Sequence, residues 1–200
     1  MANGAEAIYI VDDDPAVRDA LSVVFNLEGF EVETFSDGDT FVQSASKTHP
    51  ACVLLDVHMP GRSGIEILKA LNAEHYPAPI FIISGQGDIP MAVEAIRNGA
   101  FDFIEKPFDA EAVVSRINDG ISAMRKSQSD EPGVSFSGAD QLTRREREVL
   151  SEITNGASNK EAGRTLGISP RTVEVHRARI MEKLGAKNAA DLVRIVLGSN

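Results

Sequence analysis

The stretch "CVLLDVHMPGRSG", Cys52–Gly64, opens on four apolar residues and closes on a proline and two glycines. A single carboxylate, Asp56, separates the two parts. A short apolar run bounded by turn residues is typical of a strand that is buried on both faces. In open parallel sheets, ligands bind outside the carboxyl ends of the strands. The stretch therefore predicts a central parallel strand that presents Asp56 to a ligand at the edge of a sheet.

Similar short apolar runs recur on both sides of this stretch, at 7–11, 32–35, 80–84 and 101–105. Between them, apolar residues recur at helical spacing in 14–28, 64–74 and 88–97, and a last helix is expected from about 109 to about 125. Five strands that alternate with five helices predict an α/β fold, a doubly wound five-stranded parallel sheet covered on both faces.

Polar residues follow the ends of four of these strands: Asp12 and Asp13, Asp56, Ser84 and Lys106. Three carboxylates at one edge repel one another, so a cation must compensate. Lys106 supplies one positive charge, and Mg²⁺, which prefers carboxylate, carbonyl and water oxygens, would supply more. Such a site suits phosphoryl transfer to a nucleophilic carboxylate.

The chain of 200 residues has a net charge of −10 that is unevenly distributed. Residues 1–125 contain 20 acidic and 8 basic residues, whereas residues 141–200 contain 7 acidic and 11 basic residues. Residues 126–140, "KSQSDEPGVSFSGAD", are rich in Ser, Gly and Pro, as linkers are, and the last helix of the first part could extend into their start. We therefore expect two domains, 1–125 and 141–200, joined by a linker, with a polyanion as partner of the basic domain.

Other features of the sequence point to the cytoplasm. No run reaches the ~18 apolar residues of a membrane span, and the start, "MANGAEA", has no signal-peptide pattern. The single cysteine, Cys52, cannot form an internal disulfide and is expected to be a small buried apolar side chain. These features predict a cytoplasmic protein without a membrane segment.

Residues 141–200 have the start and stop signals of four helices. Two capping-box pairs, a Ser-Pro start and an asparagine cap mark the helix starts; they are Thr143 with Glu146, Ser158 with Glu161, Ser169 with Pro170, and Asn188. The second and third of these helices, joined by a turn with Gly167, form a helix-turn-helix pattern. The C-terminal domain is thus expected to be small and all-α.

The third of these helices has two faces of different character. Val173, Ile180 and Leu184 share the face expected to pack inward, with His176 at its border. The opposite face carries Arg171, Glu174, Val175 and Ala178, and it can enter the major groove of DNA. Glu174 could accept from cytosine and Val175 could touch a thymine methyl group. Five residues are expected to contact phosphates: Lys160, Thr172, Arg177, Arg179 and Lys183.

The motifs "VDDD", "LLDVHMPGRSG", "IISGQGD" and "FIEKPF" resemble the flavodoxin-like receiver domain of bacterial two-component response regulators, over about residues 6–125. The resemblance implies that Asp56 accepts a phosphoryl group from a sensor histidine kinase. It also implies a Mg²⁺ site formed by Asp12, Asp13, Asp56 and the backbone carbonyl of His58. Lys106 would pair with the phosphoryl oxygens, Ser84 and Phe103 would be the switch residues, and the Lys106–Pro107 bond would be cis.

The segment 142–184, with "LTRREREVL" and "RTVEVHR", resembles the LuxR-type helix-turn-helix of NarL/FixJ-family regulators, and the whole chain looks closest to the FixJ branch. The base-reading positions of that family match Glu174, Val175 and Ala178. The resemblance implies a transcription factor, not an enzyme, that binds double-stranded promoter DNA; RNA polymerase is a further candidate partner. Phosphorylation would favour a homodimer through a face with Ile89, Val93 and Phe103.

The sequence leaves three alternatives open. Control could act by masking of the basic domain instead of dimerisation, because the two domains carry opposite charge. The helical domain could bind a protein partner instead of DNA. The "DDD" at 12–14 could also mimic the D-x-D motif of a haloacid dehalogenase-type phosphatase, although Asp56 would then have no role.

Overall fold

The computed structural model describes residues 6–85, 89–129, 136 and 138–197. The chain divides into two compact units, Met1–Met124 and Arg125–Asn200. Among the described residues, no helix combines the length and the apolar character that crossing a membrane would require.

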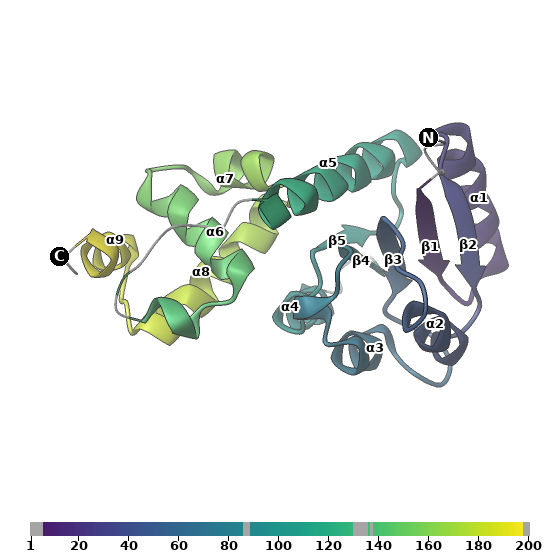
Figure 1. Ribbon diagram of the computed structural model, residues 1–200, viewed down its shortest axis with the longest axis horizontal. Coiled ribbons are helices and arrows are strands. Elements are labelled where there is room, and N and C mark those ends of the chain that lie inside the picture. Colours follow the sequence, from purple (N-terminus) through teal and green to yellow (C-terminus); the bar gives the residue numbers. More distant parts are fainter. Residues whose placement is uncertain (1–5, 86–88, 130–135, 137, 198–200) are drawn as a thin grey trace. The chain divides into compact units, whose positions relative to one another are not determined.

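The first unit is built around one parallel sheet with the strand order β2-β1-β3-β4-β5 (Figure 1). The strands are β1 (Ala7–Val11), β2 (Glu31–Phe35), β3 (Cys52–Asp56), β4 (Ile80–Ser84) and β5 (Asp102–Glu105). Every residue of β3 and β4 is buried, as continuous apolar runs predict. The expected five-stranded α/β fold is confirmed.

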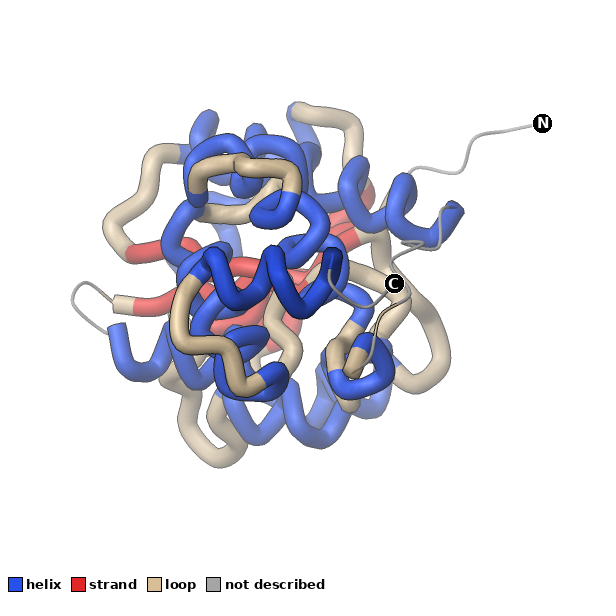
Figure 2. The backbone as a smooth tube through the Cα atoms, turned by 90° about the vertical axis from the view of Figure 1, so that its left-hand side faces the viewer, coloured by secondary structure: helices blue, strands red, loops and turns tan. Residues whose placement is uncertain are grey.

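Helices cover both faces of this sheet (Figures 1 and 2). They are α1 (Pro15–Leu27), α2 (Gly38–Ala45), α3 (Gly64–Leu71), α4 (Ile89–Arg97) and α5 (Ala110–Ser129). The helix expected over 64–74 ends at Leu71, because Asn72 adopts a left-handed conformation with φ 50° and a short 3₁₀ turn, Ala73–His75, follows. Helix α5 extends to Ser129, beyond the expected end near residue 125.

A partly buried ion pair joins helix α5 to β5. The Asp102 side chain is fully buried and pairs with the Arg116 guanidinium. The same Arg116 Nη2 donates to the Phe103 carbonyl at 2.6 Å. At Gly120 the helix approaches so closely that a Cβ atom would lie 2.6 Å from Phe81 Cζ. These contacts hold α5 against the strand that leads to Lys106.

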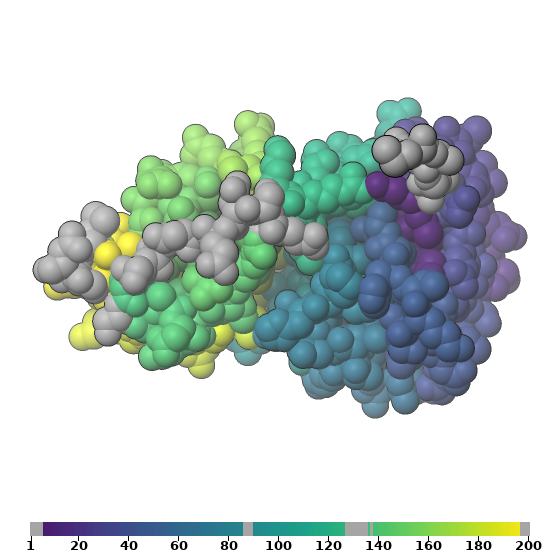
Figure 3. Space-filling model, in the orientation of Figure 1, coloured from purple at the N-terminus to yellow at the C-terminus, as the bar shows by residue number. Residues whose placement is uncertain are grey.

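The second unit contains four α-helices among its described residues, α6 (Arg144–Thr154), α7 (Asn159–Leu166), α8 (Pro170–Leu184) and α9 (Ala189–Leu197). Atoms coloured green to yellow mark the visible face of this unit in the space-filling view (Figure 3). The expected caps are present: Thr143 and Ser158 form capping boxes, Ser169 caps α8, and Asn188 Oδ1 accepts from the Asp191 amide at 2.9 Å. The all-α prediction for this part is confirmed.

The expected linker, 126–140, is only partly a linker. Its start belongs to α5, and residues 130–135 and 137 lie outside the described residues. Its end is structured, because Phe136 is buried and a 3₁₀ turn covers Ala139–Gln141. A Cβ atom on Gly138 would lie 3.1 Å from Leu184 Cδ2, so the second unit begins before residue 141.

Candidate functional site

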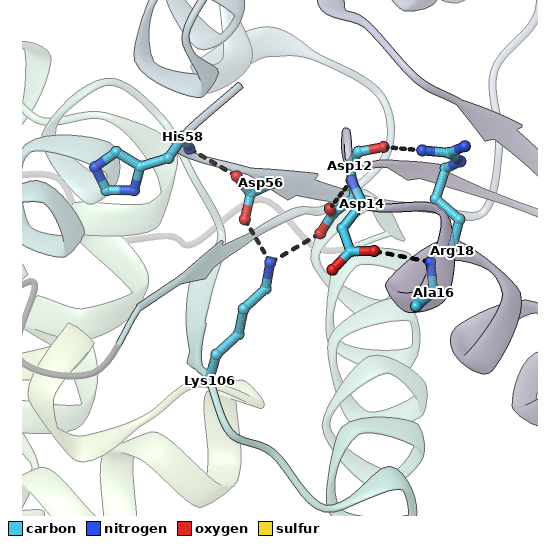
Figure 4. Close-up of polar contacts among 7 residues, drawn as sticks. All are labelled: Asp12, Asp14, Ala16, Arg18, Asp56, His58 and Lys106. Carbon is cyan, nitrogen blue, oxygen red and sulfur yellow. Dashed lines mark hydrogen bonds and ion pairs between the residues drawn. The ribbon is translucent and has the colours of Figure 1, made fainter. Parts of the chain in front are cut away.

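Polar residues at the ends of three strands, β1, β3 and β5, meet at the carboxyl edge of the sheet (Figure 4). Asp56 is the last residue of β3, Asp12 follows β1, and Lys106 follows β5. The Lys106 Nζ lies 2.8 Å from Asp56 Oδ1 and 2.9 Å from Asp12 Oδ2. One ammonium group therefore bridges two carboxylates that are distant in sequence.

This charge cluster is largely withdrawn from solvent. Asp12 is 0% exposed and Asp56 is 5% exposed. Burial raises the pKa of Asp56, and repulsion from Asp12 adds to the rise, although Lys106 opposes both effects. Burial alone would lower the pKa of Lys106, but its bonds to the two carboxylates outweigh burial and raise it. The arrangement holds excess negative charge beside one cation.

Backbone contacts fix both carboxylates in place. The His58 amide donates to Asp56 Oδ2 at 2.7 Å, and the Asp14 amide donates to Asp12 Oδ1 at 2.9 Å. The imidazole ring of His58 points away from Asp56 (Figure 4), and His58 is exposed. The carboxyl groups are thus oriented by local turns, as the short loops after β1 and β3 require.

The donor set fits a hard divalent cation. Two buried carboxylates share one ammonium, and Asp13, directly beside Asp12, is exposed. Carboxylate and backbone carbonyl oxygens with open access for water are what Mg²⁺ prefers. Within the described part of the chain, no three acidic, His or Cys side chains are already gathered into one cluster. Asp13 therefore has to join Asp12 and Asp56 for the expected ligand set to be complete.

Of the two expected switch residues, Ser84 contacts the backbone of Lys106. Ser84 ends β4, is buried, and its carbonyl accepts from the Lys106 amide at 2.7 Å. Phe103 on β5 is half-buried. The Lys106–Pro107 bond is cis, as the resemblance implied. Gln86–Asp88, directly after the exposed Gly85, lie outside the described residues.

Two residues of the expected dimer face lie on α4. Val93 on α4 is half-buried, and Ile89 is the first residue of α4. The side chain of Ile89 lies outside what the structure describes. The dimer face stays a prediction.

Two residues that shape the site were missed by the sequence reasoning. Arg18 on α1 donates from Nη1 to the Asp12 carbonyl at 2.7 Å, and thereby holds the peptide group that joins Asp12 to Asp13. A Cβ atom on Gly64 would lie 2.5 Å from the Asp56 carbonyl oxygen, so a larger residue there would displace the backbone of the acid. The glycine in the quoted stretch was a usable signal for the second residue. No sequence pattern marked the first.

The second unit contains a helix-turn-helix, formed by α7 and α8. Gly167 ends α7 in the left-handed conformation, with φ 66°. A Cβ atom on Gly163 would lie 2.7 Å from the Ile168 carbonyl oxygen, so the turn packs directly against α7. Ala162, a small residue on α7, is fully buried.

The outer face of α8 is available, as the sequence predicted. Arg171, Glu174 and Ala178 are exposed and Val175 is half-buried. Lys160, on α7, is also exposed, whereas the Arg177 Nη1 donates to Asn159 Oδ1 at 2.7 Å. The direct DNA contacts of these residues stay predictions.

Three of the residues expected to contact phosphates have partners within the second unit itself. Thr172 is 0% exposed, and its hydroxyl lies 2.8 Å from Ser169 Oγ, so it belongs to the helix start. Lys183 Nζ lies 2.7 Å from Glu146 Oε2, and Arg179 Nε lies 3.5 Å from Glu146 Oε1. The sequence pattern could not reveal these ion pairs, because Glu146 lies on another helix.

Comparisons with known proteins agree with this architecture. Residues 8–118 match the response regulator receiver domain, and residues 140–196 match the luxR family of bacterial regulatory proteins. The chain is 40% identical over 192 residues to the transcriptional regulatory protein FixJ of Bradyrhizobium diazoefficiens, covering 95% of this chain and 94% of that protein. It is 40% identical over 197 residues to the response regulator protein TodT of Pseudomonas putida, covering 98% of this chain and 87% of that protein.

Its fold is also similar to a solved structure of a relative. The crystal structure of full-length FixJ from B. japonicum matches with a TM-score of 0.59 and 39% identity, and the match covers 97% of each chain. The chain therefore belongs to the NarL/FixJ family of response regulators, and it is a DNA-binding regulator of a two-component system.

Proposed function

We propose that Asp56 is the phosphoacceptor of this response regulator and receives its phosphoryl group from a sensor histidine kinase. The observation that carries the proposal is the Lys106 ammonium, which lies within 2.9 Å of both Asp12 and Asp56 at the carboxyl edge of the sheet. In the transfer, an Asp56 carboxylate oxygen forms a bond to phosphorus while the phosphorus–nitrogen bond of the donor phosphohistidine breaks. The bonding electron pair returns to the donor imidazole.

Asp12, Asp13, Asp56 and the His58 carbonyl would hold Mg²⁺, which neutralises phosphoryl oxygens when it is bound. Lys106 keeps its proton and binds a phosphoryl oxygen. The His58 amide, which now donates to Asp56 Oδ2 at 2.7 Å, keeps the carboxyl group oriented. Preorganised donors of this kind stabilise the developing charge without a change in solvation.

The phosphoryl group then switches the surface of the receiver. It adds about −1.5 to −2 charges and three acceptor oxygens. Ser84 donates to one of these oxygens, and Phe103 moves inward, which changes the surface of α4 and β5. A shift from 1:99 to 99:1 between two states needs ~5.5 kcal/mol of differential interaction. Several charge-assisted hydrogen bonds supply energies of this order.

The changed surface, with Ile89, Val93 and Phe103, forms a homodimer. The dimer reads two half-sites of promoter DNA through Glu174, Val175 and Ala178 on each copy, with Arg171, Lys160 and Arg177 near the phosphates. Linking two domains raises their effective concentration at paired half-sites, which compensates for the few base contacts of one domain. RNA polymerase is the further partner, and the site of action is the cytoplasm.

The phosphoacceptor proposal is tested by incubating the full chain with acetyl phosphate and Mg²⁺ and measuring its intact mass. The wild-type chain is expected to gain the mass of one phosphoryl group, and Asp56→Asn is expected to gain none. Glu105→Gln, next to Lys106 but exposed, is the matched control and should be labelled like the wild type. Labelling of Asp56→Asn to the wild-type extent contradicts the proposal.

A further inference from the structure

A buried acidic residue of the second unit has no role in the functions described so far. The Glu146 side chain on α6 is 0% exposed. Its Oε2 accepts from Lys183 Nζ at 2.7 Å and from the Thr143 amide at 2.8 Å, and its Oε1 lies 3.5 Å from Arg179 Nε. A buried carboxylate of this kind persists only when it is paired and hydrogen-bonded.

The ion pairs keep Glu146 ionised. Burial alone would raise its pKa, but the bonds from Lys183 and from the Thr143 amide, with the charges of Lys183 and Arg179, outweigh burial and lower it. The two cations lose much of their exposure in return, because their side chains are 29% and 17% exposed, respectively. Glu146 therefore engages two positive charges of α8 inside the unit.

Both partners of Glu146 lie on one face of α8. Arg179 and Lys183 are four residues apart, which places them one turn apart on the same side of the helix. The apolar contacts of α8 through Val173 and Ile180, both 0% exposed, do not fix its rotation alone, because hydrophobic burial is non-directional. The charge-assisted hydrogen bond from Lys183 to Glu146 does constrain it, since such a bond has a defined geometry, and the attraction of Arg179 to the second carboxylate oxygen acts in the same direction.

We propose that Glu146 is a positioning residue for DNA recognition: it sets the rotation of α8 and withholds Arg179 and Lys183 from DNA phosphates. The inference rests on the proposed base-reading face, which this rotation points outward. It separates the cations of α8 into two groups. Arg171 remains available to DNA, whereas Arg179 and Lys183 pair with Glu146 inside the unit.

The proposal predicts an unusual response to loss of the carboxylate charge. In Glu146→Gln, α8 loses its fixed rotation, so base contacts weaken. At the same time two cations are released toward phosphates, which strengthens binding that ignores sequence. Each added phosphate contact steepens the dependence of log K on log salt concentration by about 0.9. Specific and non-specific binding should therefore change in opposite directions.

The test uses the full chain and two DNA duplexes. One duplex is selected from a random pool with the wild-type chain, and the other is a scrambled sequence of the same composition. Every variant is treated identically with acetyl phosphate and Mg²⁺, and circular dichroism checks that it is folded. If the wild-type chain does not discriminate between the two duplexes, the proposed base-reading face fails before any variant is compared.

For Glu146→Gln we expect affinity for the selected duplex to fall about tenfold or more, as the loss of a base contact does. Affinity for the scrambled duplex should stay equal or rise. The slope of log K against log salt concentration for this duplex should become steeper by about 1 to 2. Glu182→Gln removes the same charge from an exposed position of α8 and is the matched control. It should shift binding to both duplexes equally and only slightly.

Two further variants keep the inference testable if Glu146→Gln does not fold. Lys183→Met should leave the salt dependence on the scrambled duplex unchanged, and Lys183→Arg, which can keep the ion pair, should retain wild-type discrimination. A fall of about 1 in the salt slope of Lys183→Met shows a phosphate contact and overturns the proposal. Parallel losses on both duplexes in Glu146→Gln, with an unchanged salt slope, show a purely structural role and overturn it as well.

Discussion

At the scale of single residues, the stability of the receiver site depends on how much positive charge lies next to its carboxylates. The Lys106 ammonium group contacts both Asp12 and Asp56, at 2.9 and 2.8 Å. The exposed Asp13 adds a third negative charge beside them. Like charges at one edge of a sheet repel one another, and a bound cation relieves this repulsion. Metal binding and folding stability of the first unit should therefore be coupled.

Mg²⁺ is accordingly expected to raise the unfolding temperature of the full chain. A ligand that binds only the folded state stabilises it by about 2.7 kcal/mol at one hundred times its dissociation constant. Asp13→Asn should lose most of this stabilisation while it remains folded without the metal, because Asp13 is exposed. Thermal unfolding with increasing MgCl₂ measures the effect, and Asp19→Asn on the exposed side of α1 is the control. An equal Mg²⁺ response in Asp13→Asn and wild type contradicts the ligand assignment.

The residues at the carboxyl edge were predictable because each follows a strand whose apolar run is easy to recognise. Asp12, Asp56, Ser84 and Lys106 all lie where this rule places them. Arg18 was not predictable, because its bond to the Asp12 carbonyl depends on a side-chain direction that no spacing rule gives. The sequence therefore predicts the site residues at the strand ends, but not the side-chain contacts that support them.

At the scale of elements, the inner face of α8 contains a charged cluster next to a neutral buried histidine. His176 is 4% exposed, and within the described structure neither ring nitrogen has a hydrogen-bond partner. Burial lowers the pKa of His176 to about 3, and the nearby cations Arg145, Arg179 and Lys183 add to the decrease, whereas Glu146 opposes it. The folded unit therefore keeps this histidine neutral.

The neutral histidine makes stability depend on pH. Between the ordinary histidine pKa of about 6.5 and the lower folded value, the unfolded chain binds one more proton than the folded chain, so stability falls as the pH falls. The slope from this group is at most about 1.4 kcal/mol per pH unit. His176→Leu should remove this contribution and flatten the acid side of the stability curve.

Differential scanning calorimetry of the full chain at about pH 7 and about pH 5 measures the change. His75→Gln, at an exposed histidine of the first unit, should keep the wild-type dependence. An unchanged pH dependence in His176→Leu contradicts the assignment of this slope to the buried ring.

Helix starts were well predicted, because caps are local. Ser158 and Glu161 are three residues apart, and their mutual hydrogen bonds need nothing from the rest of the chain. Partners on other helices were not predicted. The charge of Lys183 and its place on α8 predict a phosphate contact, but they give no sign of its bond to Glu146, which is 37 residues away in the sequence. A basic residue near a DNA-reading helix is therefore weak evidence for a phosphate contact.

At the scale of the whole molecule, an acidic receiver and a basic DNA-binding domain belong to one chain. Opposite charges on the two domains are compatible with both masking and dimerisation as the mode of control. The dimer hypothesis makes the stronger prediction, because it requires one apolar face of α4 and β5. Val93 is half-buried there, so an acidic side chain at this position is tolerated in the monomer but would be buried in a dimer.

Val93→Asp should therefore accept the phosphoryl group normally and fail to dimerise. We expect its dimer dissociation constant after treatment with acetyl phosphate to rise at least about tenfold, as measured by sedimentation velocity. Val23→Asp, at a 59% exposed position on α1, introduces the same charge away from this face and should dimerise like the wild type. Dimerisation of phosphorylated Val93→Asp at wild-type strength excludes this face.

The most direct measurement is the affinity of the full chain for its selected duplex, with and without acetyl phosphate and Mg²⁺. We expect acetyl phosphate and Mg²⁺ to raise the affinity of the wild-type chain for this duplex at least about tenfold and to leave the affinity of Asp56→Asn unchanged. An equal rise in Asp56→Asn, or no rise in a wild-type chain shown to be phosphorylated, would contradict control of DNA binding by Asp56.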